Sequence, residues 1–587
     1  MRTKRTSGST TATSVMLCGA LTTLGCNATF EVGESALSGG AASGPGPQSS
    51  SSTADADGSQ TTSTAGAAET TAAADDGSGP RPPIFDVDPG DIPPVPVAPE
   101  FPQTCKEAEE GTTSVGCEFY PYVPPTVGVV SYNAVGFMVT NVSSAPAAVL
   151  LSDRDGVVQS ANIAPGQIHT FAVEAPHQTS LDTQIAGNSY VLTSNEVVQM
   201  FEFYPLDFGI DDDAGLVLPA TALGTRHRVA TYNGGSGYLG GQQYISVVAV
   251  EDQTEITVTL GPSTIATLAG GGVPALDVAS GNDTTAVVLD RLEVLTIAAS
   301  GWDGSDLTGT LVDSDRPVAV YSGASATYVP AVPGPWDFPG GPDTIPPGIH
   351  QHQAGDLLFD AIPPTTVWGT QYAGVKFMPL GQEPDVWRLM ADTDGTEITL
   401  SGDVTDVFTL DAGEFVDLQT PGNFWAHSAD AFALVHYMTS AALVDPDVLE
   451  MRQGSYPTID THDCGLLEWP GDPAMTWAYP VGNWLRRYVF PVGQQGPRQA
   501  SWCHDHVTIV APAERWGDVM FDGLPLPPGE PLGDSPMDFV RIPGVLPAYE
   551  LVAPAGVGVE LTVYGYRSSG SYAYPGGLGL QTLNPAG

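Results

Sequence analysis

The side chains best suited to chemistry in this chain are histidines and aspartates that recur in short runs. Two His-x-His pairs occur, at His350/His352 and His504/His506. On a strand, residues i and i+2 face the same side, so each pair presents two imidazoles that could share one metal ion. Neither pair has a third ligand in view, and protein metal sites need one. We therefore interpret both pairs as polar residues beside strands and predict no metal and no cofactor.

Three aspartate runs have the residue types of a calcium loop, namely 211–213, 153–156 and 392–395. No glutamate follows any of them at the spacing of an EF-hand loop. The last two runs end in Asp-x-Asp-Gly or Asp-Gly, which is the composition of a tight hairpin turn. The sequence therefore predicts turns at these positions rather than ion sites.

The motifs of common catalytic sites are missing from the sequence. There is no Gly-x-Ser-x-Gly elbow, no phosphate-binding Gly-rich loop with a lysine, and no His-Glu-x-x-His helix. We predict no catalytic residue. The alternative, a carbohydrate-active or hydrolytic enzyme on a β scaffold, would need a deep central pocket with two carboxylates within about 10 Å.

Aromatic residues gather in the stretches 331–372 and 477–502. Exposed rings there would stack on sugars or anchor a protein partner, whereas buried rings would fill a core between sheets. Trp336 and Phe338 lie in a loop-like insertion that breaks the spacing of the surrounding strands, so we predict that they bind the ligand. The remaining aromatic residues are more typical of a core: Trp368, Tyr372, Trp477, Tyr479, Trp484, Tyr488 and Trp502.

The N-terminus has the features of a lipoprotein export signal over residues 1–26. Basic residues at positions 2, 4 and 5 precede an apolar run that is too short to span a bilayer. The run ends in Thr-Leu-Gly-Cys26, which resembles a lipobox, so Cys26 is the predicted site of lipidation. An ordinary signal peptide cleaved nearby is the alternative. Asn27, in place of Asp, favours the outer membrane over retention in the inner one.

Four cysteines remain after Cys26: Cys105, Cys117, Cys464 and Cys503. An even number in an exported chain predicts two disulfides, with three possible pairings. Proximity in the sequence favours the pairs 105–117 and 464–503. Neither spacing is the Cys-x-x-Cys of a zinc site.

Composition separates a linker at 27–100 from a folded part at 101–587. The linker is rich in Ser, Thr, Ala and Gly and then in Pro, so it cannot bury enough apolar surface to fold and is predicted to be disordered and then stiff. The whole chain carries 67 acidic and 19 basic residues, a net charge of −48. Such a field repels phosphate groups and excludes nucleic acid as a partner.

One strand pattern recurs about four times in the folded part. It is clearest in Tyr244–Val250 with Thr254–Leu260 and in Arg388–Ala391 with Thr396–Leu400, where an apolar strand, a turn and an alternating strand follow one another. Weaker copies occupy 137–198 and 507–564. Pro-containing connectors, each followed by a short strand, recur at 216–224, 363–369 and 480–484. We predict an all-β fold of about four antiparallel units in a propeller-like ring, with tandem β-sandwiches as the alternative.

These repeats resemble the N-terminal domain of the IgG Fc-binding protein family. The resemblance extends from Cys105 to the C-terminus and is carried by Val247–Leu260, 306–310 with 316–320, 363–369, and the closing residues 563–577. Ala573 stands where the family has Gly. The resemblance implies a bacterial surface homologue that binds an extracellular protein, and it brings no catalytic motif.

Together these features predict a lipid-anchored protein of the outer membrane or cell surface. Its predicted role is adhesion to, or recognition of, an extracellular protein or glycan. The alternatives are the secreted enzyme described above and a structural protein of the envelope.

Overall fold

The computed structural model of the chain describes part of the compact unit Val87–Gly587. The described residues are 98, 101–111, 113–124, 134–174, 181–187, 189–204, 213–233, 242–300, 305–330, 356–379, 383–440, 471–492, 504–544, 548–567 and 570–587. The predicted export signal, Cys26 and nearly all of the predicted linker lie outside these residues. Among the described residues, no helix has the length and apolar composition needed to cross a membrane.

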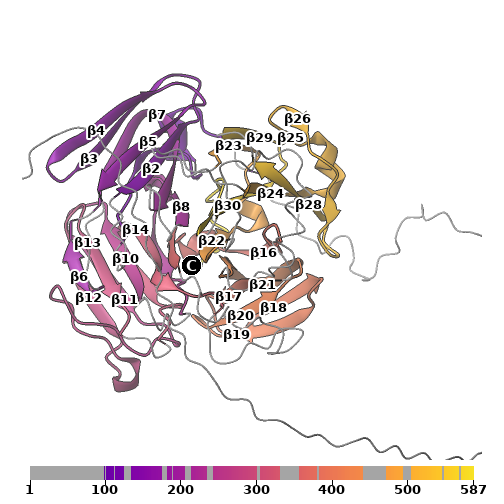
Figure 1. Cartoon of the computed structure of the whole chain (residues 1–587). Coiled ribbons are helices and arrows are strands. Elements are labelled where there is room, and N and C mark those ends of the chain that lie inside the picture. Colours follow the sequence, from indigo (N-terminus) through magenta and orange to yellow (C-terminus); the bar gives the residue numbers. More distant parts are fainter. Residues whose placement is uncertain are drawn as a thin grey trace, which may run out of the picture. The chain divides into compact units, whose positions relative to one another are not determined.

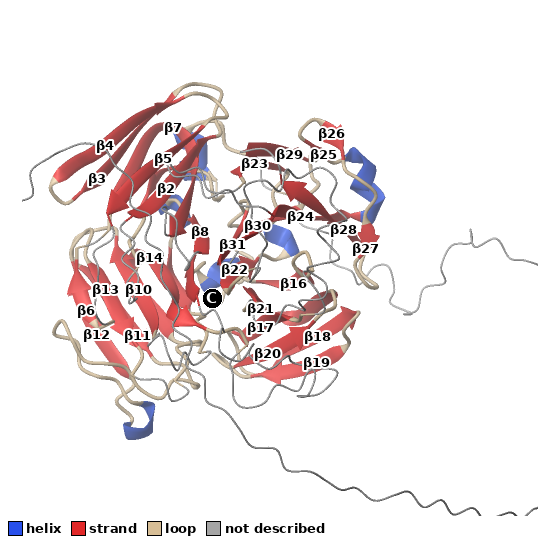
Figure 2. Ribbon diagram, in the orientation of Figure 1, coloured by secondary structure: helices blue, strands red, loops and turns tan. Residues whose placement is uncertain are grey.

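Nearly all described elements are strands (Figure 2), and they form four copies of one pattern of seven strands. We call the strand positions A to G in chain order. The long strand F pairs over its first half with A and C and over its second half with B and G. C also pairs with D, and B with E. Each of the first three units is therefore one antiparallel sheet built on strand F, and the fourth is divided into two sheets.

The first two repeats follow this pattern in full (Figure 1). The strands of the first are β1 (Gly116–Phe119), β2 (Ala134–Asn141), β3 (Ala147–Asp153), β4 (Gly156–Ile163), β5 (Ile168–Glu174), β7 (Val191–Tyr204) and β8 (Asp213–Val217). Those of the second are β9 (Gly224–Arg228), β10 (Gln243–Ala249), β11 (Thr254–Thr259), β12 (Thr284–Leu289), β13 (Val294–Ala298), β14 (Leu311–Thr327) and β15 (Asp356–Ala361). An added strand, β6 (Gln184–Ala186), extends the second sheet by pairing with β13.

The third and fourth repeats differ in strand F, which is continuous in the third and broken in the fourth. The strands of the third are β16 (Gly369–Gly374), β17 (Asp385–Ala391), β18 (Thr396–Gly402), β19 (Asp406–Leu410), β20 (Phe415–Thr420), β21 (Phe424–Met438) and β22 (Ala474–Ala478). Those of the fourth are β23 (Arg487–Pro491), β24 (His504–Pro512), β25 (Met520–Phe521), β26 (Leu524–Pro525), β28 (Met537–Gly544), β29 (Ala548–Val552), β30 (Glu560–Arg567) and β31 (Gly570–Pro575). Here β29 and β30 together take the place of F, and β27 (Glu530–Pro531) pairs with β28.

Local sequence explains these strands. In β11, Thr254, Ile256 and Val258 are buried while Glu255 is exposed, so one face covers the core and the other meets solvent. The equivalent strand β18 shows the same alternation. Asp153 accepts hydrogen bonds from the main-chain N–H groups of residues 155 and 156, which closes the turn between β3 and β4 as predicted.

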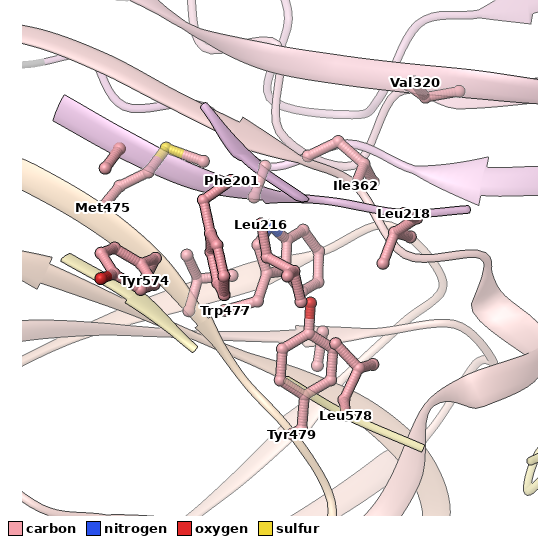
Figure 3. Close-up of a cluster of buried hydrophobic side chains, with 14 of the residues drawn as sticks. Phe201, Leu216, Leu218, Val320, Ile362, Met475, Trp477, Tyr479, Tyr574 and Leu578 are labelled. Atoms are coloured by element: carbon pink, nitrogen blue, oxygen red, sulfur yellow. The ribbon is translucent and has the colours of Figure 1, made fainter. Parts of the chain in front are cut away.

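The G strands bring the four repeats together. Strand β8 contacts β15, β15 contacts β22, β22 contacts β31, and β31 returns to β8, so the innermost strands close a ring. Figure 3 shows the core they share, with side chains from all four repeats: Phe201, Leu216, Leu218, Val320, Ile362, Met475, Trp477, Tyr479, Tyr574 and Leu578. The predicted propeller-like ring of about four units is confirmed.

One Pro-Gly contact recurs in three repeats. Pro219, Pro364 and Pro480 begin the short 3-10 helices η1 (Ala220–Ala222), η4 (Thr365–Val367) and η6 (Val481–Asn483). Each proline packs on the glycine that begins strand A of its own repeat: Gly116, Gly224 and Gly369. A Cβ on any of these glycines would lie 2.4 Å from the proline Cβ. These are therefore positions where a side chain cannot fit.

The first predicted disulfide is confirmed. Cys105 and Cys117 are bonded, with their Cα atoms 5.6 Å apart, and join helix α1 (Cys105–Glu110) to β1. Cys464 and Cys503 lie outside the described residues, so the second disulfide stays a prediction.

Replacing Gly369 by alanine tests the Pro-Gly contact. The added methyl group would overlap Pro480, so we expect Gly369→Ala to lower the free energy of unfolding by about 1–3 kcal/mol. The matched control is Gly517→Ala, where an added Cβ meets nothing within 4 Å. Urea denaturation of the two variants measures the difference, and equal midpoints for Gly369→Ala and the wild type would contradict the contact.

Candidate functional site

A buried cluster of ionisable side chains lies where the third and fourth repeats meet. Lys376, which follows β16, places its Nζ 2.9 Å from Glu383 Oε1 and 3.2 Å from Asp385 Oδ1. Asp385 Oδ2 lies 2.6 Å from His436 Nε2 on strand β21. All four side chains are buried, so each charge depends on its neighbours rather than on water.

The imidazole of His436 is held between two aromatic rings. The ring of Phe377 lies 3.8 Å from it and that of Trp387 3.5 Å, both nearly parallel to it. Burial lowers the pKa of His436 below its ordinary value, although Asp385 opposes this effect. Burial alone would raise the pKa of Asp385, but Lys376 and His436 together bring it below its usual range. The site therefore holds a neutral imidazole beside an ionised carboxylate.

The fourth repeat holds the cluster from the other side. The main-chain N–H of Met378 donates to Tyr564 Oη, at 2.9 Å, and Tyr566 Oη donates to the carbonyl of Met378, at 3.1 Å. Arg541 Nε donates to the carbonyl of Lys376, at 2.8 Å. The segment that carries Lys376 is thus fixed by side chains from two other strands, β28 and β30.

A small cavity of about 20 Å³ adjoins this cluster. Its lining residues come from both repeats: Ala373, Val375, Trp387, His436, Thr476, Trp477, Ala478, Thr508, Val510, Glu560 and Thr562. Four of these residues have a buried polar atom without a hydrogen-bond partner among the described residues: Trp387 Nε1, Thr476 Oγ1, Trp477 Nε1 and Glu560 Oε2. A space of this size holds one water molecule, which these atoms could bind, but no sugar or peptide side chain.

Glu560, at the start of β30, is the acid of this cavity. Burial raises its pKa to about 8, and the N–H of Tyr479 offsets part of that effect. The carboxyl is therefore protonated at neutral pH. A protonated carboxyl and a neutral imidazole could act as proton donor and proton acceptor. The cavity, however, leaves no room for a substrate between Glu560 and His436.

Stability should depend on pH through Glu560. Its pKa rises from 4.5 to about 8 on folding, so within this range the folded chain holds more protons than the unfolded one. The free energy of unfolding should therefore fall as pH rises from about 4.5 to 8. Glu560→Gln should reduce this fall, and Glu514→Gln, at an exposed side chain, should not. Urea denaturation at pH 5 and pH 9 tests this, and an unchanged slope in Glu560→Gln would contradict it.

Two further carboxylates lie where the innermost strands meet. Asp213 on β8 accepts hydrogen bonds from the main-chain N–H groups of Phe359, at 3.0 Å, and Met475, at 3.2 Å. Asp360 on β15 accepts one from the N–H of Trp477, at 3.3 Å. Burial raises the pKa of both carboxyls well above the usual range. Neither residue lines the cavity, and the bonds to main-chain N–H groups connect strands. The enzyme alternative would instead require two carboxylates that face a pocket.

Few of the residues predicted from motifs belong to this site. His506 is buried on β24 with its ring 5.5 Å from that of Tyr564, and Asp392 forms an ion pair with Arg228 at 2.7 Å. The described residues contain no group of three His, Cys, Asp or Glu side chains placed to hold a metal. The predicted core aromatics are confirmed as buried: Trp368, Tyr372, Trp477, Tyr479, Trp484 and Tyr488.

Several predicted residues cannot be compared. Trp336 and Phe338, the predicted ligand-binding residues, lie outside the described residues. The same holds for His350, His352, Trp502, residues 211–212 of the first aspartate run and the side chain of His504. Sequence reasoning missed the Lys376 cluster. The signal for it was a lysine and an aspartate in otherwise apolar stretches, Val-Lys-Phe at 375–377 and Asp-Val-Trp at 385–387.

Comparison with known proteins identifies the family of the folded part. Residues 213–565 match the family described as IgGFc binding protein, and this range is more than half of the chain. It begins at strand β8 and ends in β30, so it contains the whole Lys376 cluster and Glu560. The search of curated proteins found no match.

Proposed function

Because the chain belongs to the IgGFc binding protein family, we propose that it is a recognition protein that binds an extracellular protein, or a glycan carried by one. The observation that supports this most is the family match over residues 213–565, which spans strands of all four repeats. Adhesion of the bearing cell to its surroundings is the role that we propose for this binding.

The site geometry favours binding at the outer surface. The ionisable groups at the boundary of the third and fourth repeats are paired with one another, and the adjoining cavity of about 20 Å³ admits no substrate. The two carboxylates at the innermost strands bind main-chain N–H groups. Because the described interior offers a partner no space larger than a water molecule in this cavity, loops and sheet edges are the surfaces that we propose for binding.

We further propose that the protein is displayed on the outer membrane by a lipid on Cys26. The basic N-terminus, the short apolar run and Thr-Leu-Gly-Cys26 support this proposal. The Cys105–Cys117 disulfide is consistent with it, because disulfides persist in oxidising compartments outside the cytosol. Residues 27–100 would then separate the ring from the membrane.

Partner binding is tested with the full chain displayed on cells. Labelled extracellular proteins, immunoglobulin Fc among them, are added to cells with and without the chain. The same cells are applied to a glycan array. We expect saturable binding of at least one protein or glycan with a Kd of about micromolar or tighter. Protease treatment of the bound material distinguishes a protein from a free glycan. Absence of saturable binding in both arms would contradict the proposal.

Anchoring is tested by Cys26→Ser, with Cys18→Ser as the matched control. The wild type and Cys18→Ser should incorporate labelled fatty acid and stay with the membrane fraction, because several acyl chains anchor a protein durably. Cys26→Ser should lose the label and leave that fraction. Equal labelling of Cys26→Ser and the wild type would show that Cys26 is not the acylated residue.

A further inference from the structure

The outermost strand of each repeat, position D, exposes a large apolar side chain. Val157 on β4, Val288 on β12, Val407 on β19 and Leu524 on β26 are 59%, 55%, 55% and 69% exposed. Each D strand ends its sheet and pairs only with its C strand among the described residues. A strand edge with exposed apolar side chains is a template on which another chain can add a strand.

The third repeat differs from the others in charge. Its described cations, Lys376 and Arg388, are both buried and paired with carboxylates. Its exposed acidic residues outnumber any exposed lysine or arginine among the described residues, and one of them, Asp417, pairs with Arg388. Seven others form no ion pair with a described residue: Asp394, Glu397, Asp403, Asp406, Asp411, Glu414 and Asp430. The other three repeats carry partly exposed arginines, such as Arg154, Arg316 and Arg515.

Strand β19 lies at the outer edge of its sheet (Figure 1), and several of these carboxylates belong to it, to the adjoining turns or to the neighbouring strand β18. Asp406 begins the strand, and Asp411 follows its end and accepts a hydrogen bond from the N–H of Gly395, at 3.0 Å. On the neighbouring strand, the exposed Glu397 faces Thr409. Phe408 packs against the core of this repeat, so Val407 points the other way, toward solvent.

We infer that the edge of β19 binds an extended basic polypeptide segment of the partner by strand addition. The N–H of Val407 already donates to Asp406 Oδ1, at 2.8 Å, so the other main-chain groups on the open edge of β19 supply the hydrogen bonds. Val407 supplies an apolar contact, and the nearby carboxylates select lysine and arginine over acidic side chains. A metal ion would use neither the strand edge nor Val407. This inference rests on the proposed function and specifies the chemistry of the partner.

The test uses a fluorescent peptide of alternating lysine and valine and its alternating glutamate and valine counterpart, each titrated into the full chain. We expect the basic peptide to bind, with affinity that falls as salt rises, and the acidic peptide not to bind. Val407→Lys should weaken binding of the basic peptide at least about tenfold. Val288→Lys is the matched control, since Val288 lies on the D strand of the second repeat, faces solvent and has the same exposure, and it should have little effect.

Each other outcome counts against the inference. Failure of the basic peptide to bind, equal binding of the acidic one, or equal losses in both variants would overturn it, as would binding of Ca²⁺ alone that displaces the peptide. Both valines are exposed, so both variants should unfold at the wild-type urea concentration. If cells that display the wild-type chain bind a partner, and cells that display Val407→Lys bind it equally well, this inference alone fails. If the peptide binds but cells bind nothing, the proposed function alone fails.

Discussion

The fold depends on how the four innermost strands satisfy their main-chain hydrogen-bonding groups. Strands β8, β15 and β22 each pair with strand F on one edge, and their other edge faces the neighbouring repeats, where water is excluded. A buried N–H without a partner costs free energy comparable to a lost hydrogen bond. Asp213 and Asp360 supply the acceptors, and Ser571 Oγ accepts from the N–H of Asp472 in the same way, at 2.8 Å.

Buried ion pairs add specificity to these contacts. Arg388 lies on β17 in the third repeat, and it pairs with Asp306 of the second at 2.9 Å and with Asp417 at 2.7 Å. Arg228 of the second repeat pairs with Asp392 of the third, at 2.7 Å. Removing one member of such a pair leaves a buried charge without a partner, which costs free energy. The ion pairs therefore favour the one arrangement of the repeats in which all of them form. The chain has only 19 lysine and arginine residues, and Arg228, Lys376 and Arg388 are buried.

This use of cations has a consequence for the surface. The third repeat keeps its described lysine and arginine buried, so its exterior is negative without local compensation. Within the described residues, by contrast, the buried side chains of the four repeats pack into large shared clusters, with a small cavity beside Glu560. The same distribution of charge thus makes a rigid scaffold and leaves a surface that favours positively charged partners.

Strand content, the repeat and its approximate number were accessible from sequence because they are local. The alternation of Thr254–Thr259 and its copy at Thr396–Gly402 repeats every second residue, and Asp-Gly turns follow from neighbouring residues. The Cys105–Cys117 pair was favoured for the same reason, since only a short stretch of chain separates the two residues. The acidic balance and the candidate lipobox are likewise properties of composition and of short motifs.

Tertiary structure alone decided which polar residues meet. Asp213 accepts a hydrogen bond from Met475, 262 residues away, and Asp385 contacts His436 on the neighbouring strand. Neither pairing has a sequence period or motif. The closure of four G strands into a ring decides the first contact, and the pairing of β17 with β21 decides the second. At such buried positions, burial rather than residue type controls whether a carboxyl such as Glu560 keeps its proton.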